Sequence, residues 1–231
     1  MSEACTDQAS DGEMIRQLRR RWKPIKQRLT EQQKSHPTNI RFHRACSWLR
    51  RVEQMDEESD LDLALTCRWI AFNALYGQWD PVLGEPRPDR ECWRRFLDRV
   101  LALDGEKRLV DVLMTHKRLV LAILDDAYVA GFFWKSPSTE RAVKTTRDRR
   151  QAATWYLQKR WALLLEHVVE RIYLLRCQLL HGAATYGSKL NRTSLRRCTR
   201  MLGLLLPTVL AVWIEHGADE DWGAMCYPPQ S

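Results

Sequence analysis

Residues 161–182 read WALLLEHVVERIYLLRCQLLHG, and this stretch has the clearest periodicity in the chain. Its apolar side chains alternate spacings of four and three, which is typical of one buried helix face, at Trp161, Leu165, Val168, Ile172, Leu175 and Leu179. Gly182 follows, and glycine is the residue best suited to end a helix. The stretch predicts a long helix around which the rest of the chain is arranged.

Two polar side chains near the end of this helix carry chemistry. Arg176 bears a permanent positive charge, and His181 has the side chain that titrates near neutral pH. If the helix continued, His181 would point about 140° away from Arg176, at about 100° per residue. The two groups can meet only if the helix unwinds near Gly182 or if two chains share a pocket, so we expect a homodimer.

The remaining patterns are helical, with no strand alternation and no internal repeat. Helices are expected at residues 39–55, 61–76, 91–103 and 107–129, with a loop at residues 80–89 and a final helix that Pro207 bends. Pro24 is expected to interrupt any helix in residues 14–28, and residues 1–12 are expected to be unstructured. These patterns predict an all-α, up-and-down helical bundle with a long motif-bearing helix and a C-terminal apolar helix.

The domain organisation follows from the same patterns. Residues 1–38 are expected to form a flexible or partly helical basic segment, residues 39–217 a single helical domain, and residues 218–231 an acidic and then proline-containing tail.

Within residues 61–76 the inward positions should be Leu61, Leu65, Trp69, Phe72 and Tyr76. Asn73 lies among these aromatics, where a buried amide needs a hydrogen-bond partner, so it either holds two helices in register or contributes directly to a site.

The charge favours an anionic partner. The 231-residue chain has a net charge of +8, and its 45% hydrophobic content is enough for a core. Arginines make up 28 of the 37 basic residues, and arginine suits bidentate contact with phosphate. Residues 14–28 and residues 171–200 each carry seven basic residues and no acidic one. The first segment is interpreted as a nucleic-acid-binding arm or a solvated helix face, and the second as the best candidate footprint for an RNA backbone.

Cysteine usage and hydropathy favour a cytoplasmic protein. The seven cysteines are odd in number and scattered, which indicates reduced thiols, and no cationic and then apolar leader opens the chain. The apolar run at residues 201–214 is interrupted by Pro207 and is shorter than the roughly 20 residues of a membrane span, so it predicts a buried helix. No membrane association is expected.

The sequence resembles a known family in several places. Residues 176–182, Arg-Cys-Gln-Leu-Leu-His-Gly, are similar to the Arg-x(4–6)-His signature of HEPN domains, helical bundles of which many are metal-independent endoribonucleases. Residues 69–77, Asn191-Arg192, Asp221-Trp222-Gly223 and Tyr227-Pro228-Pro229 resemble flanking features of a bacterial HEPN branch. Where that branch has asparagine or another polar residue after the motif arginine, this chain has Cys177.

The resemblance implies cleavage of RNA by attack of the 2′-hydroxyl on phosphorus, without a metal or other cofactor. It implies that His181 transfers a proton, that Arg176 stabilises the transition state, and that two subunits face each other. The expected RNA-binding residues are Arg171, Gln178, Lys189, Asn191 and Arg192, with Asn73 and Gly182 as structural support. Family members often act as toxins or in phage defence, and some are restrained by an antitoxin or regulatory protein.

Three other interpretations remain open. Arg176 and His181 can serve only to neutralise and cap the helix end. The pairs Cys177/His181 and His43/Cys46 have spacings that can place zinc ligands on one helix face. The chain can also be a non-catalytic dimeric helical module that binds RNA or a protein partner.

Overall fold

The computed structural model describes residues 11–187, 189 and 191–228, and the side chains of residues 11, 12 and 141–149 are not included in that description. The expectation that residues 1–12 are unstructured lies outside the described residues for residues 1–10, and it is wrong for Asp11 and Gly12, where α1 begins. The described helices are α1 (Asp11–Gln32), α2 (Pro37–Val52), α3 (Leu61–Tyr76), α4 (Asp89–Leu103), α5 (Arg108–Thr115), α6 (Lys117–Leu124), η1 (Ala127–Val129), α7 (Gly131–Trp134), α8 (Thr139–Leu157), α9 (Trp161–Leu180) and α10 (Arg192–His216). The prediction of an all-α bundle with a long motif-bearing helix and a C-terminal apolar helix is confirmed.

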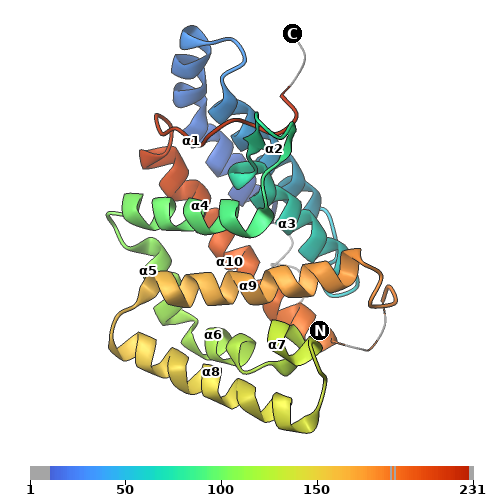
Figure 1. The fold of residues 1–231 in the computed structure, drawn as a ribbon. Helices are drawn as coiled ribbons and strands as arrows, with labels where there is room; N and C mark the ends of the chain where they lie inside the picture. The colour runs from blue at the N-terminus through green and yellow to red at the C-terminus, as the bar shows by residue number, and fades with distance from the viewer. Residues whose placement is uncertain (1–10, 188, 190, 229–231) are drawn as a thin grey trace, which may run out of the picture.

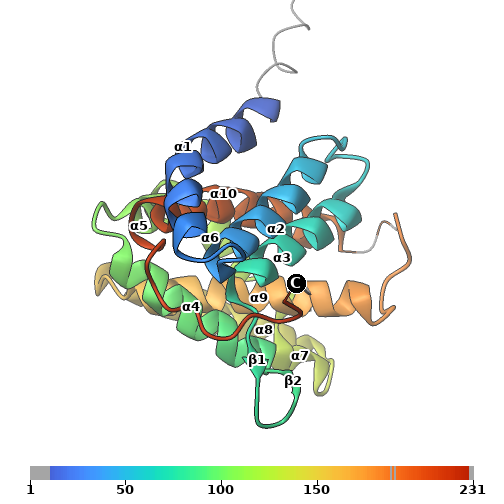
Figure 2. The ribbon, with the colours of Figure 1, turned by 90° about the horizontal axis from the view of Figure 1, so that it is seen from above.

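The long helix α9 lies across the molecule between α4 on one side and α8 on the other (Figure 1). Helices α2 and α3 form a closely packed pair, and α1 packs against α2 at the far end of the molecule (Figures 1 and 2). The apolar helix α10 contacts α1, α3, α4, α5, α6 and α9, and so it ties the layers together.

Helix α10 contains a long apolar window. By length and composition alone it is long and apolar enough to cross a membrane, yet 61% of its apolar window is buried inside this structure. Met201, Leu210 and Trp213 are fully buried in the main core. The predicted burial of residues 201–214 is confirmed, and Pro207 lies inside a helix that runs uninterrupted from Arg192 to His216.

The first helix differs from its prediction. Pro24 does not interrupt it, and α1 runs from Asp11 to Gln32 with the proline inside. The missing backbone hydrogen bond at a proline is tolerated where tertiary packing holds the helix. Here Ile15, Leu18, Trp22 and Leu29 enter the main core, so α1 is packed as part of the same core as residues 39–217.

The helix expected at residues 107–129 is divided into three. Helix α5 ends at Thr115 and α6 begins at Lys117, with His116 between them. The short helix η1 follows Asp126, whose carboxylate accepts a hydrogen bond from the Tyr128 backbone N–H at 3.0 Å. At the start of α5, the Asp104 carboxylate accepts hydrogen bonds from the backbone N–H groups of Arg108 at 3.0 Å and Leu109 at 2.8 Å. Aspartate side chains thus hold the backbone at the starts of α5 and η1, whereas the division between α5 and α6 falls at His116.

The C-terminal segment packs onto the body instead of forming a free tail. Trp222 stacks on Trp213 with ring centroids 4.2 Å apart, and its indole N–H donates to the Gly217 carbonyl at 2.8 Å. The segment expected as a loop at residues 80–89 takes part in a small antiparallel hairpin, whose strands β1 (Trp79–Asp80) and β2 (Glu85–Pro86) have two residues each. Beside this hairpin, Gln78 forms an isolated antiparallel β-bridge with Met225 of the C-terminal segment. The C-terminal segment is thus fastened beside α3.

A buried arginine on α2 completes this fastening. Arg41 is 1% exposed, and its guanidinium donates to the carbonyls of Leu75 at 3.0 Å, Gly77 at 2.7 Å and Gly223 at 3.0 Å. Burial lowers the pKa of Arg41 to about 10, so it remains charged at neutral pH. One cation therefore joins the end of α3 to the C-terminal segment.

Candidate functional site

The end of α9 has the hydrogen-bond pattern of a glycine-terminated helix. The Ala183 backbone N–H donates to the Gln178 carbonyl at 2.9 Å, and the Gly182 N–H donates to Leu179 at 3.2 Å. Gly182 has φ +70°, the left-handed conformation that glycine adopts without strain. Gly182 thus ends the helix, as its place after the apolar stripe predicted, and His181 lies exposed at the C-cap.

Arg176 points from α9 toward α3 and α4. Its side chain is 21% exposed, its Nη1 lies 3.9 Å from an Asp89 carboxylate oxygen, and its guanidinium carbon lies 5.9 Å from the Trp69 ring centroid. The Arg176 Nε is buried and has no hydrogen-bond partner among the described residues. At 3.9 Å the contact with Asp89 is an ion pair and not a hydrogen bond, so the guanidinium keeps unused donors.

Asp89 is held in place by α3. Its carboxylate accepts hydrogen bonds from the Tyr76 hydroxyl at 3.2 Å and from the Asn73 side-chain amide at 3.3 Å. Burial, and then the Asp89 charge, raise the pKa of Tyr76 well above its usual value of 10.0, so the phenol stays a neutral donor. Asn73 therefore joins α3 to α4, as expected of a residue that holds two helices in register, and it lines the same cavity as Arg176.

Arg176, Asp89 and Asn73 line one side of a cavity of about 380 Å³. Its other walls come from α2, from the hairpin and from the C-terminal segment. Arg44 of α2 lies in the wall and donates to the backbone carbonyls of Cys226 at 3.0 Å and Tyr227 at 2.6 Å. The cavity thus has cationic side chains, one carboxylate and the aromatic rings of Trp48 and Trp69.

His181 is not among the residues that line this cavity. Its side chain is exposed at the end of α9, whereas Arg176 turns inward toward α3 and α4. The chain by itself does not bring the two motif residues together, as the divergence computed from the sequence predicted.

The structure corrects the expectation for Arg171. This side chain is only 5% exposed, and its Nη2 donates to the Leu124 carbonyl at 3.4 Å. It faces the interior because residue 171 adjoins Ile172 of the apolar stripe and lies under α6. Arg171 is therefore an interior residue, out of reach of an RNA phosphate.

The other expected RNA-binding residues differ in availability. Arg192 pairs with Asp62 at 2.5 Å, and these side chains are 24% and 12% exposed. Gln178 donates to the Tyr128 carbonyl at 2.7 Å and accepts from the Asn191 amide at 3.4 Å, so both side chains fasten the loop after α9. Lys189 is exposed.

The two Cys/His pairs whose sequence spacing suits zinc, Cys177/His181 and His43/Cys46, do not come together in the fold. Within the described part of the chain, no group of three or more His, Cys, Asp or Glu side chains lies close enough to hold a metal ion. Cys46 is buried, and desolvation raises the pKa of its thiol to about 12, which disfavours the thiolate needed for metal binding. All six cysteines among the described residues are free thiols.

Sequence reasoning gave Asp89 and Arg44 no part in the site. Asp89 follows two prolines at the start of α4, where a carboxylate is ordinarily explained by helix capping and dipole effects. Arg44 lies in a helix with several other arginines. Neither residue carries a local signal, because both reach the cavity only through the packing of α2 and α4 against α3.

Comparison of this chain with protein-family models, with curated proteins and with solved structures finds no match.

Proposed function

We propose that this protein is a metal-independent endoribonuclease that acts as a homodimer, with Arg176 of one subunit and His181 of the other on one phosphodiester. The observation that supports this best is the state of Arg176. Its side chain lines an open cavity and is 21% exposed, and its nearest carboxylate oxygen lies 3.9 Å away, beyond hydrogen-bonding distance. Such a guanidinium can still donate to a phosphate.

The chemistry requires one proton to leave and one to return. The 2′-hydroxyl attacks the adjacent phosphorus, the bond to the 5′-oxygen breaks, and a 2′,3′-cyclic phosphate and a 5′-hydroxyl form. Neutral His181 accepts the proton of the 2′-hydroxyl or, when protonated, donates one to the leaving oxygen. Arg176 stabilises the additional negative charge on the phosphorane-like transition state.

The dimer is needed because each chain separates the two groups. His181 is exposed at the end of α9, where a second copy can approach it, and Arg176 is reached through the cavity. A two-fold axis then makes two equivalent composite sites. By its resemblance to HEPN domains, such an enzyme would serve as a toxin or phage-defence effector and would be restrained by a partner protein.

The proposal is tested with Arg176→Ala and His181→Ala in a cleavage assay on single-stranded RNA with chelator present. Each variant should lose about 10²–10³-fold in rate, and the products should carry cyclic phosphate ends. Arg118→Ala and His216→Ala alter exposed residues of the same types outside both basic segments and should cleave normally. Cleavage that chelation abolishes contradicts the mechanism.

A mixing experiment tests the composite site itself. If each site takes Arg176 from one chain and His181 from the other, a mixed dimer of Arg176→Ala and His181→Ala chains contains one intact site. Random mixing of the two inactive proteins should then restore about a quarter of wild-type activity. No restoration, with dimers shown to exchange, rules out a site shared between subunits.

A non-catalytic binding module is the second candidate, and the Asp89 charge beside Arg176 and the Cys177 thiol favour it. Arg176 donates only a weak 3.9 Å hydrogen bond to the Cys177 sulfur, where related motifs have a stronger hydrogen-bonding residue. Under the enzyme proposal, Cys177→Asn should preserve or raise cleavage. Expression of the wild-type protein should arrest growth, with relief by His181→Ala, and the binding module predicts neither result.

A further inference from the structure

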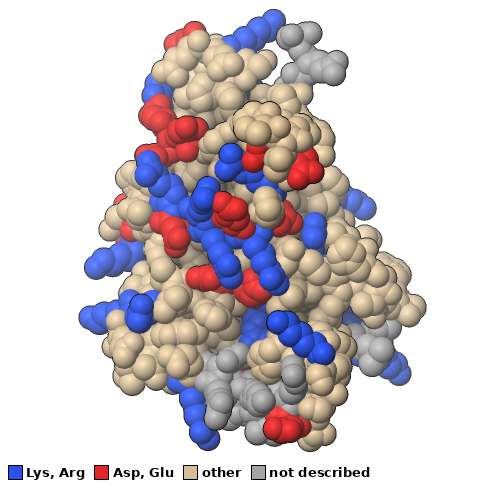
Figure 3. Space-filling view, in the orientation of Figure 1, with Lys and Arg blue, Asp and Glu red and all other residues tan. Residues whose placement is uncertain are grey.

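Most of the arginines in the described residues are ion-paired. Over α4 and α9, basic and acidic side chains interleave on the surface (Figure 3). The pairs on this face include Arg90 with Glu170 at 2.7 Å and Arg94 with Glu166 at 2.9 Å. Such cations are already neutralised, so they add little to the attraction of a polyanion.

One surface departs from this pattern, the groove between α1 and α2, which we call the α1–α2 groove. It has a volume of about 770 Å³, and none of the described residues that line it is acidic. Its basic lining residues are Arg16, Arg19, Arg20, Lys23, Lys26, Lys34 and Arg44. Of these, Arg20, Lys23, Lys26 and Lys34 are exposed and have no ion pair in the described part of the chain.

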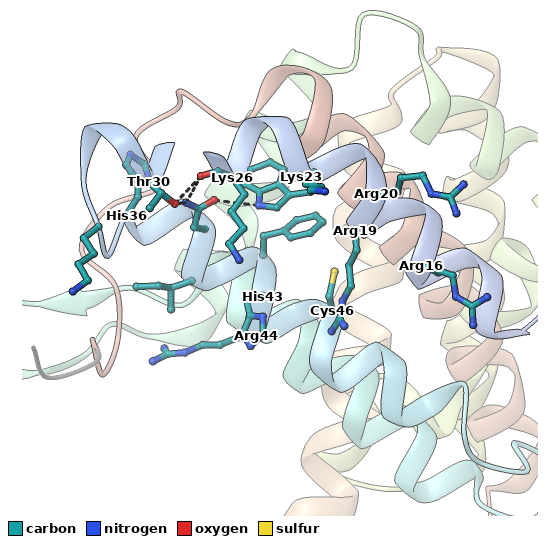
Figure 4. A pocket seen from close by; sticks show the side chains of 15 residues that line it. Arg16, Arg19, Arg20, Lys23, Lys26, Thr30, His36, His43, Arg44 and Cys46 are labelled. Carbon is teal, nitrogen blue, oxygen red and sulfur yellow. Dashed lines mark hydrogen bonds between the residues drawn. The ribbon is translucent and has the colours of Figure 1, made fainter. Parts of the chain in front are cut away.

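The floor of the groove is apolar. Trp22 and Phe42 stack beneath it with ring centroids 4.4 Å apart, and Ile40 lies half-buried beside them. The Trp22 indole donates to the Asn39 side chain at 3.2 Å, which fixes the floor to α2 (Figure 4). The groove therefore combines a firm apolar base with exposed cations at its edges.

The cations form a row and not a single cluster. From Arg16 to Lys26 the row extends about 15 Å along α1, at about 1.5 Å per residue. In Figure 4, Arg16 and Arg20 lie at one end and Thr30 and His36 at the other, and the Lys26 ammonium between them points toward His43 of α2. A row of this length fits a chain of phosphates better than one small anion.

We infer that the α1–α2 groove binds single-stranded RNA, with phosphates on the cationic edges and bases over the apolar floor. A nucleic acid single strand has both kinds of surface, a charged backbone and apolar base faces. A planar membrane surface would touch only the rim of a concave groove. The inference rests on the proposed function for the choice of RNA as the strand.

The groove also meets the Arg176 cavity. Arg44 lines both hollows, because its side chain lies where α2 passes between α1 and the C-terminal segment. A strand held along α1 therefore leads past Arg44 toward Arg176. The groove would thus hold RNA that extends to the cleavage site.

Binding is measured with a fluorescent 2′-O-methyl oligoribonucleotide of about 12 nucleotides, which cannot undergo 2′-hydroxyl attack and so separates binding from cleavage. The groove variant is Lys23→Gln/Lys26→Gln/Lys34→Gln in the full chain. It should bind about tenfold more weakly, and the slope of log affinity against log salt should fall by roughly 2, at about 0.7 for each phosphate that the protein no longer neutralises. Lys→Arg substitutions at the same three positions should retain binding.

The matched control is Lys107→Gln/Lys135→Gln/Lys159→Gln, which removes three exposed lysines outside the groove. It should bind within about twofold of wild type. Equal weakening in the groove and control variants overturns the inference. So does tighter wild-type binding to duplex or to phosphatidylserine vesicles than to the single strand.

The two proposals fail differently. If the oligonucleotide binds and the groove variant weakens that binding, but natural RNA is not cleaved, the nuclease proposal is rejected and the groove proposal stands. If cleavage depends on Arg176 and His181 but the groove variant binds the oligonucleotide normally, the groove proposal is rejected and the nuclease proposal stands.

Discussion

Residues 14–28 and residues 171–200 each carry seven basic residues and no acidic one, and the fold uses these two segments differently. In the second segment Arg171 is buried, and four arginines lie near carboxylates from other helices or loops. The pairs are Arg176–Asp89, Arg192–Asp62, Arg196–Glu58 and Arg197–Asp126. In the first segment, only Arg21 and Arg28 have carboxylate partners on another element among the described residues, Glu215 and Asp219.

The difference arises from what each segment packs against. One side of α1 faces the end of α10 and the segment after it, where Glu215 neutralises Arg21 and Asp219 neutralises Arg28. The other side faces α2, where His43 and Arg44 line the shared groove and add further basic groups. A local excess of positive charge therefore indicates a binding surface only where the neighbouring helix supplies no acid.

The strongest contrast with a free cation is the buried Arg41, and Arg41→Met should have the largest effect on stability. The substitution leaves several carbonyls at the end of α3 and in the C-terminal segment without a donor. We expect the free energy of unfolding to fall by about 3–5 kcal/mol in chemical denaturation. Arg20→Met, on the exposed face of α1, should change it by less than about 0.5 kcal/mol. Similar losses in both variants would remove the distinction between buried and free cations.

A second experiment removes the carboxylates that neutralise two arginines of residues 171–200. Glu58→Gln with Asp62→Asn removes the carboxylates that pair with Arg196 and Arg192. Stability should fall by about 1–2 kcal/mol, mainly through the less exposed Asp62 pair. Affinity for the 2′-O-methyl oligonucleotide should rise about two- to fivefold.

Net charge alone could raise that affinity, so a charge-matched variant is required. Glu85→Gln/Glu106→Gln removes two exposed carboxylates, and Arg108 keeps its other partner, Glu215. It should bind RNA as the wild type does. An equal rise in both variants would mean that overall charge, and not local pairing, decides where RNA binds.

The smallest predicted effect concerns the paired side of α1 at acid pH. Hydrogen bonds from Arg108 lower the pKa of Glu215 below its ordinary 4.5, and those from Arg28 lower the pKa of Asp219 below 3.8. Depressed carboxylate pKa values stabilise the fold above the ordinary pKa, and that stabilisation disappears as pH falls through the lower folded values. The contribution should therefore be constant from neutral pH to about 5 and be lost below about 4.

The measurement is the midpoint of thermal unfolding as a function of pH. Glu215→Gln/Asp219→Asn should lower the midpoint at pH 7 by about 2–4 °C and should differ less from wild type at pH 3. If the difference in unfolding midpoint between the variant and the wild type were the same at pH 3 and pH 7, the ion pairs would make no pH-dependent contribution to stability.

The helices were largely predictable because their signals are local. The stripe residues Leu165, Val168, Ile172 and Leu175 of α9 are buried, as their spacing predicted. The five inward positions predicted for α3, Leu61, Leu65, Trp69, Phe72 and Tyr76, are buried as well. Periodicity reports which side of a helix is apolar, and the core then covers that side.

The structure differs from the sequence-based predictions mainly where the outcome depended on tertiary packing. Pro24 lies within α1 because packing against the core holds the helix across the missing hydrogen bond. Trp222, expected in a tail, stacks on Trp213 of α10. The cavity beside Arg176 needs Asp89 and Arg44, which lie 87 and 132 residues before it in the chain.

The sequence by itself determined that the chain is helical, which faces are apolar and where α9 ends, because those properties depend on neighbours within one or two helical turns. Only the tertiary structure decided which cations remain free. Arg192 and its partner Asp62 are 130 residues apart, whereas Lys23 and Lys26 face a helix with no acid in reach of the groove. Neutralisation requires an opposite charge within a few ångströms, and that proximity is set by how the helices pack.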